Sequence, residues 1–110
     1  MVKYWGIKII GDNVMKPTIT EENRRLFRAI LTLKTEDECA AFFEDICTIK
    51  EIQDLSQRLE VASMLNCGEK YQKIEETTGA STATISRVNK CLNYGSGGYK
   101  TVLERIEEDA

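Results

Sequence analysis

Between Gly79 and Asn93, apolar and polar residues follow one another with the spacing of a two-faced helix. At about 100° per residue, Ile85, Val88 and Leu92 share one face, which predicts a buried side. The opposite face carries small, amide, hydroxyl and cationic side chains, the groups that contact base edges and phosphates. Together with Gln72 just upstream, the candidate DNA-binding residues are Gln72, Ser81, Thr82, Ala83, Thr84, Ser86, Arg87, Asn89, Lys90 and Asn93.

A tight turn precedes this helix. Gly79 favours the left-handed conformation that ends a helix, and the Ser81 hydroxyl can cap the next one. A short helix before the turn would direct Tyr71, Ile74 and Thr78 inward. Two short helices joined in this way are typical of a helix-turn-helix, whose second helix enters the DNA major groove. We therefore predict helices at about 71–78 and 82–93. An ordinary polar surface helix is the competing interpretation, but it does not explain the turn and the cap.

The distribution of charge supports this interpretation more than the total charge does. The formal net charge is −3, so the protein is not uniformly basic. Acidic residues crowd the middle of the sequence, whereas the segment 77–103 has none and contains Arg87, Lys90 and Lys100. A phosphate backbone can approach such a segment without repulsion. Uneven surface charge with no partner is the alternative that charge alone leaves open.

The length and composition are those of one compact domain. The chain has 110 residues, of which 42% are hydrophobic. We expect a strand-like or loose arm over residues 1–20, because Val2, Tyr4, Ile7 and Ile9 alternate loosely before a Gly11-Asp12-Asn13 turn and Pro17. The domain itself should span residues 21–110.

Helical spacing of apolar residues covers most of this domain. One helix is predicted from Glu22 to about Lys34, with an apolar stripe that requires a partner surface. Thr35 and Thr48 each begin a capping-box pattern, with Glu38 and Glu51 three residues on. The apolar stripe of the first helix is Leu26, Phe27, Ile30, Leu31 and Leu33. The residues expected to be buried in the next two helices are Cys39, Phe42, Phe43 and Ile46, and then Ile52, Leu55, Leu59, Ala62 and Leu65 over residues 49–66. The spacing of Tyr99, Val102, Leu103 and Ile106 predicts a final helix. The fold class is therefore all-α, with five to six helices.

The segment from Ile74 to Arg87 resembles bacterial repressor helix-turn-helices. More closely, the chain is similar to the tryptophan-repressor-like (TrpR-like) superfamily, in its YerC/YecD branch, from about Arg24 to Ile106. The motifs that carry this resemblance are residues 42–48 (FFEDICT), 57–62 (QRLEVA) and 78–94. The resemblance implies an intertwined helical homodimer whose two reading helices address successive major grooves of a near-palindromic DNA site.

The resemblance also marks a possible effector site. In the tryptophan repressor a threonine and two arginines hold the amino acid, and Thr48, Arg58 and Arg87 stand at those positions. Each has a simpler role available: helix cap, surface charge and phosphate contact, respectively. Val88 stands where the repressor has a glycine beside the ligand ring, and a valine there fills that space. We therefore expect no response to tryptophan, with a different small-molecule effector left open.

Other functions find less support in the residues. The chain has no histidine for acid–base work near neutral pH and no phosphate-binding loop, which argues against an enzyme. Cys39, Cys47, Cys67 and Cys91 lack metal-site spacing, so neither a metal nor another cofactor is expected. We expect free, mostly buried thiols in a cytoplasmic protein without a membrane segment. Redox sensing would require an exposed Cys91, and its helix position predicts burial. A protein-interaction module that uses the helix-turn-helix shape without DNA remains the alternative function.

Overall fold

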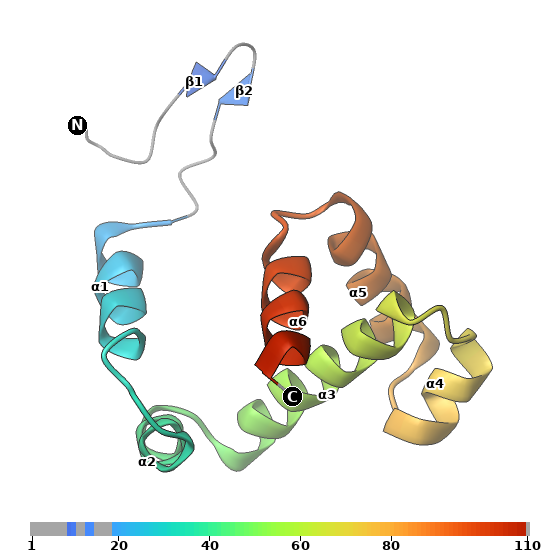
Figure 1. The fold of residues 1–110 in the computed structure, drawn as a ribbon, viewed down its shortest axis with the longest axis horizontal. Helices are drawn as coiled ribbons and strands as arrows, with labels where there is room; N and C mark the ends of the chain where they lie inside the picture. Colours follow the sequence, from blue (N-terminus) through green and yellow to red (C-terminus); the bar gives the residue numbers. More distant parts are fainter. Residues whose placement is uncertain (1–8, 11–12, 15–18, 110) are drawn as a thin grey trace. The chain divides into compact units, whose positions relative to one another are not determined.

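Helices make up nearly all of the structure that is described. The computed structural model describes residues 9–10, 13–14 and 19–109. Its helices are α1 (Glu21–Ile30), α2 (Glu36–Ile46), α3 (Ile49–Asn66), α4 (Tyr71–Thr78), α5 (Thr82–Tyr94) and α6 (Gly98–Asp109), as Figure 1 shows. The all-α prediction is therefore confirmed, and the number of helices is at the upper end of the expected range.

The strands in the described residues are two short segments before α1. β1 (Ile9–Ile10) pairs antiparallel with β2 (Asn13–Val14), with Ile9 opposite Val14. This agrees with a strand-like arm, although Val2, Tyr4, Ile7, Gly11, Asp12 and Pro17 lie outside the described residues. The boundary of the arm at residue 20 stays a prediction.

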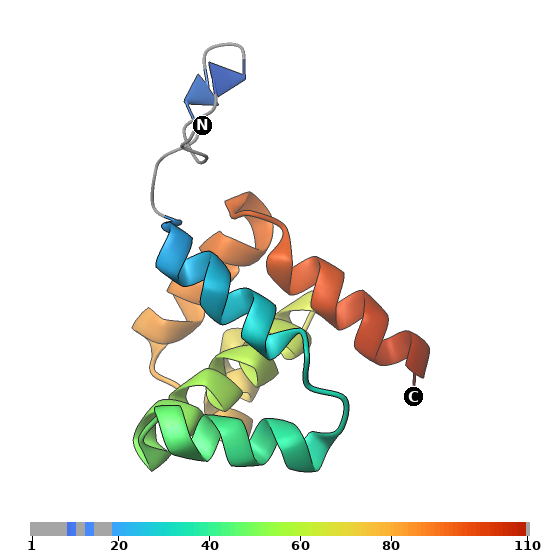
Figure 2. The same cartoon turned by 90° about the vertical axis from the view of Figure 1, so that its left-hand side faces the viewer.

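The chain forms two compact units, residues 1–45 and 46–110. In the first unit, α1 and α2 are joined by a short connection, which is clearest in Figure 2. Neither helix has a fully buried residue. The expected buried face of α2 is only partly covered, since Phe42 and Phe43 are half-buried whereas Cys39 and Ile46 are exposed. Leu31, the C-cap of α1, is 82% exposed. An amphipathic helix gains its stability mainly by packing its apolar face, and much of that face of α1 is exposed.

The two helix ends in this unit differ in detail from the prediction. α1 ends at Ile30, earlier than Lys34, because the chain tightens after it: the Thr32 amide donates to the Ala29 carbonyl oxygen (3.1 Å). The Thr35 hydroxyl accepts from the Glu38 amide as expected (3.0 Å). The Glu38 carboxylate, however, accepts from the Lys34 amide (2.7 Å) rather than from that of Thr35.

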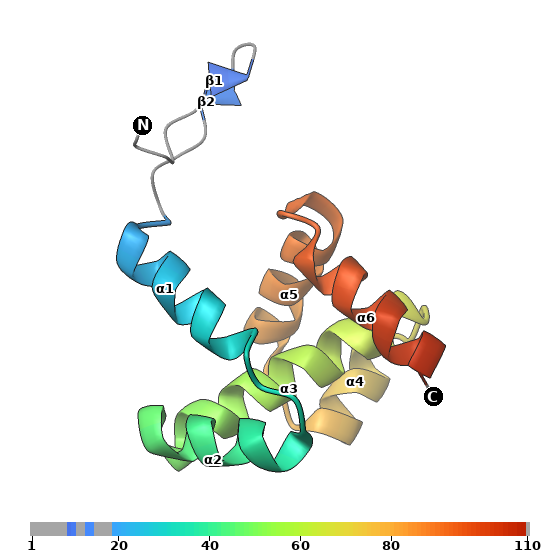
Figure 3. The same ribbon diagram turned by 60° about the vertical axis from the view of Figure 1, so that its left-hand side comes forward.

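The second unit contains a single hydrophobic core. Its members come from α3, α4, α5, α6 and the turn after α4, and all are at most 6% exposed: Val61, Ala62, Ile74, Ala80, Ile85, Val88, Leu92 and Leu103. α3 contacts each of the other three helices, and α5 contacts both α4 and α6. In Figure 3, α6 follows α5 after a turn in the glycine-rich segment 95–98. Burying this much apolar surface is the main source of stability for the unit.

The buried side of α3 is only partly the predicted one. Ala62 is buried as expected, and the fully buried Val61 was not predicted. Leu55 is 44% exposed, against expectation. Because α4, α5 and α6 pack on α3 in this unit, they decide which side is covered, and Leu55 lies away from it. The final helix is present as predicted, with Leu103 buried and Val102 and Ile106 exposed.

Candidate nucleic-acid interface

The turn between α4 and α5 has the geometry that its sequence predicts. Gly79 takes the left-handed conformation (φ 76°), and its amide donates to the Glu75 carbonyl oxygen (2.9 Å). The Ser81 hydroxyl then accepts a hydrogen bond from the Thr84 amide (3.1 Å), which caps α5. These contacts end one helix and begin the next within a few residues. The predicted helix-turn-helix is therefore present as a structural motif.

A side chain of α3 holds this turn in place. The Gln57 amide nitrogen Nε2 donates to the Thr78 carbonyl oxygen (3.1 Å), a bond between residues far apart in sequence. The Thr78 hydroxyl donates to the Ile74 carbonyl oxygen (2.7 Å) and accepts from the Ala80 amide (3.1 Å). Sequence reasoning missed this role of Gln57, because no local pattern links it to the turn.

α5 has the two faces that were predicted. Ile85, Val88 and Leu92 are 0%, 1% and 6% exposed. Among the DNA-binding candidates, Thr84 and Asn89 are half-buried, and the exposed ones are Gln72, Ser81, Thr82, Ala83, Ser86, Arg87, Lys90 and Asn93. The inner face fixes α5 on the core, and the outer face is accessible to a partner.

Two amides on the outer face are joined to each other. Asn93 Nδ2 donates both to the Asn89 side-chain oxygen (3.0 Å) and to the Asn89 carbonyl oxygen (2.9 Å). They lie one helical turn apart, on the same side of α5. Any surface that contacts this side would meet the two amides as a pair.

A carboxylate of α4, that of Glu75, lies beside the start of α5, which the sequence did not predict. The Thr82 hydroxyl donates to Glu75 Oε2 of α4 at 2.7 Å. Glu75 precedes the acid-free segment 77–103, and the fold of the turn brings it back beside that segment. The expectation of a surface without acidic groups is therefore wrong at this end of α5.

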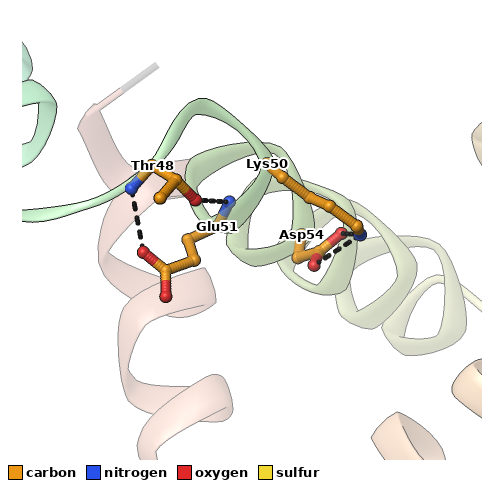
Figure 4. A network of polar contacts seen from close by, with 4 residues as sticks. All are labelled: Thr48, Lys50, Glu51 and Asp54. Atoms are coloured by element: carbon orange, nitrogen blue, oxygen red, sulfur yellow. Dashed lines mark hydrogen bonds and ion pairs between the residues drawn. The ribbon is translucent and has the colours of Figure 1, made fainter.

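The four possible effector residues differ in their surroundings. Thr48 forms a complete capping box with Glu51, drawn in Figure 4 beside the Lys50–Asp54 ion pair (3.1 Å). Arg58 is half-buried on α3 and Arg87 is exposed on α5, while Val88 belongs to the core. Two grooves lie in the part of the chain that the structure describes, and none of the four residues lines either of them.

One of these grooves is largely apolar and lies among α3, α5 and α6. Its volume is about 500 Å³, it is open to solvent, and its lining residues are Leu59, Cys91, Gly95, Ser96, Gly98, Tyr99 and Val102. The second groove has a similar volume, about 510 Å³, and lies along α3 next to Thr78.

The expectation of mostly buried cysteines is wrong. Cys39, Cys67 and Cys91 are exposed and Cys47 is half-buried, all as free thiols. Cys91 is exposed because its side of α5 faces the open groove and not the core. Burial therefore gives no argument against a redox role for it. No group of residues suited to hold a metal ion occurs among the described positions.

A small helical unit that presents a capped, two-faced helix after a glycine turn belongs to the helix-turn-helix class of proteins. Comparison with known proteins makes this more specific: residues 21–107 match the Trp repressor protein family, and the chain belongs to that family. The family is regulatory and not enzymatic, which agrees with the expectation from sequence.

Relatives support the assignment over most of the chain. The chain is 59% identical to YerC, an uncharacterized protein of Bacillus subtilis (strain 168), over 80% of this chain and 85% of that protein. A crystal structure of a TrpR-like protein from Eubacterium eligens ATCC 27750 matches with a TM-score of 0.77 and 59% identity, over 80% of this chain and 91% of that one. A solved structure from Staphylococcus aureus matches with a TM-score of 0.77 and 50% identity, over 80% and 88%. The predicted resemblance to the tryptophan-repressor-like superfamily is thereby confirmed.

Among the described residues, no helix is both long enough and apolar enough to cross a membrane.

Proposed function

We propose that this protein is a sequence-specific transcriptional regulator in the cytoplasm that binds double-stranded DNA through α4 and α5. The observation that carries the proposal is the two-faced α5: its inner side is fixed in the core, and its outer side presents hydroxyl, amide and cationic groups. A helix held rigidly by a buried face can place its N-terminal side chains against base edges in the major groove.

The candidate residues divide into two roles. Thr82, Ala83 and Ser86 are small and lie near the start of α5, so they allow the helix to approach base edges closely. Arg87 and Lys90 carry charges suited to the phosphate backbone, which fixes orientation without reading sequence. The Asn89–Asn93 pair lies farther along the same helix, where amides can bond a base or a phosphate.

The working form is a homodimer. Large apolar side chains are left exposed on α1 and its C-cap, at the end of α2, on α3 and on α6 of the single chain: Leu26, Phe27, Leu31, Ile46, Ile49, Leu55, Val102 and Ile106. Exposed apolar surface on this scale marks an interaction site. A second copy offers the same surface, and a twofold dimer would place two α5 helices about 34 Å apart along the DNA, one helical turn.

The regulator does not use tryptophan as its effector. Val88 is 1% exposed and packs in the core, so an indole ring has no space next to the α5 backbone at that point. Thr48 is occupied by its capping box with Glu51. Isothermal titration with free tryptophan should give no heat of binding at millimolar concentrations, and tight binding would contradict this part of the proposal.

Salt-dependent DNA binding tests the main proposal. The purified protein should select a reproducible, near-palindromic motif from random DNA, and its affinity for that motif should fall steeply as salt rises. The double variant Arg87→Ala, Lys90→Ala removes phosphate contacts. The slope of the logarithm of the binding constant against the logarithm of the salt concentration should therefore become shallower, by about one to two units for each bound helix-turn-helix.

The matched control is Arg28→Ala with Lys50→Ala. It makes the same change in net charge at side chains that are exposed and paired on α1 and α3. Its salt dependence should equal that of the wild type. If neither the wild type nor this control binds any DNA more tightly than random sequence, the protein is an interaction module without DNA, and the proposal fails.

A further inference from the structure

We propose that Glu75 and Thr82 together recognise a cytosine in the major groove, which makes Glu75 a specificity-determining residue. This inference rests on the proposed function, because it assumes that the start of α5 faces DNA. The observation behind it is the 2.7 Å hydrogen bond from the Thr82 hydroxyl to Glu75 Oε2, which joins α4 to the first residue of α5.

The direction of this hydrogen bond limits what the pair can bind. A carboxylate only accepts hydrogen bonds, so the Thr82 hydroxyl must use its single proton for Glu75. The lone pairs that remain on both side chains are acceptors. Both side chains are exposed, so these acceptors are open to an incoming ligand. The pair therefore favours a ligand that donates hydrogen bonds.

Among the four bases, cytosine fits two acceptors best. In the major groove, guanine and thymine present acceptor oxygens, which a carboxylate would repel. Adenine presents its N6 amino donor next to the N7 acceptor, so a second acceptor on the protein would oppose N7. Cytosine presents one free N4–H and no acceptor on the same base, so two acceptors on the protein oppose it least, and glutamate is the side chain that accepts from it.

The position of the carboxylate also argues against a purely electrostatic role in binding. A negative charge on a DNA-facing surface weakens attraction to every phosphate, so it lowers affinity for all sequences. Such a charge increases specificity only if one particular base donates a hydrogen bond to the carboxylate and so offsets the lost affinity. A stabilising effect on the positive N-terminus of α5 is the structural alternative, and it predicts an effect on stability without an effect on base preference.

Site selection from random DNA with the wild type and three variants tests the proposal. In the wild-type motif, one position of each half-site should be cytosine, and replacing it by thymine should weaken binding about five- to 150-fold. Glu75→Gln should lose that preference, with adenine gaining at the same position because glutamine bonds its N6 and N7. Thr82→Val should weaken the preference, because it removes the hydroxyl that orients Glu75. All other positions of the motif should be unchanged.

Glu76→Gln is the matched control. Glu76 is an exposed carboxylate next to Glu75 on the same helix, so this variant removes the same charge without touching the pair. Both variants should bind random DNA more tightly than the wild type, but only Glu75→Gln should change the motif. Thermal unfolding of each variant separates base reading from helix stabilisation.

The outcomes distinguish this inference from the proposed function. If the wild type selects a motif and Glu75→Gln selects the same one, the pair is structural and the inference is overturned, whereas the proposed function stands. A change in unfolding temperature without a change in motif leads to the same conclusion. If the wild type selects no motif, the proposed function fails and the inference fails with it.

Discussion

The two compact units of this chain use apolar residues in opposite ways. Residues 46–110 bury Ile74 and Ile85 completely and keep polar groups on the outside of α5. In residues 1–45, by contrast, α1 and α2 have no buried residue, and Phe27 and Leu31 are exposed. The first arrangement is that of a self-sufficient core, and the second is that of a surface that requires a partner. The second unit therefore carries the proposed reading head, and the first unit adds its exposed apolar residues to those of α3 and α6 for the proposed dimer.

A substitution at Leu31 should have the largest effect on the proposed dimer. Leu31→Lys places a charge on the apolar face of α1, at a helix C-terminus where a cation favours the helix itself. Burying a leucine contributes about 1.5–3 kcal/mol, and the change occurs in both copies, so the dimer dissociation constant should rise about 10²- to 10⁴-fold. Analytical ultracentrifugation over a dilution series measures it.

Asn66→Lys is the control for this substitution, since it adds a lysine at the end of α3 without removing an apolar contact. It should leave the dissociation constant unchanged. An unaltered assembly in Leu31→Lys would show that this face of α1 does not bind the partner copy.

A smaller effect is expected inside the core of the second unit. Ile85→Ala removes a fully buried side chain of α5 and should lower the free energy of unfolding by about 2–5 kcal/mol. The exposed neighbour provides the contrast: Ser86→Ala should change stability by less than about 0.5 kcal/mol, yet weaken DNA binding. Denaturant unfolding and a DNA-binding titration on both variants test the two-faced helix. Equal loss of stability in the two variants would contradict it.

The turn of the helix-turn-helix should give the smallest effect. Gly79→Ala forces a side chain into the left-handed conformation and should cost about 1–2 kcal/mol, although open space surrounds the added methyl group. Gly98, the first residue of α6, does not take this conformation. Gly98→Ala should therefore be neutral or stabilise by up to about 1 kcal/mol. Thermal unfolding compares the two, and an unchanged transition in Gly79→Ala would show that the turn tolerates another geometry.

Local patterns in the sequence were sufficient to predict the helices and the turn. Gly79, Ser81 and Thr48 act through contacts within a few residues of themselves, so their roles follow from residue type and spacing. The inner face of α5 was also predictable, because the period of a helix fixes which side chains point together. The resemblance carried by residues 78–94 gave the family, which the comparisons confirm.

Contacts between distant residues were decided by the tertiary structure alone. Which side of α3 is covered depends on where α4, α5 and α6 pack, and so Val61 is buried and Leu55 is not. Gln57 reaches the turn, and Glu75 returns to the start of α5, only because the chain folds back on itself. By itself, then, the sequence determined a helix-turn-helix with one apolar and one polar face, since helix period and caps are local. The tertiary structure decided that the Glu75 carboxylate lies beside the start of α5. The contact between Glu75 and Thr82 crosses the turn between α4 and α5, and the spacing of residues in the sequence does not fix how that turn folds.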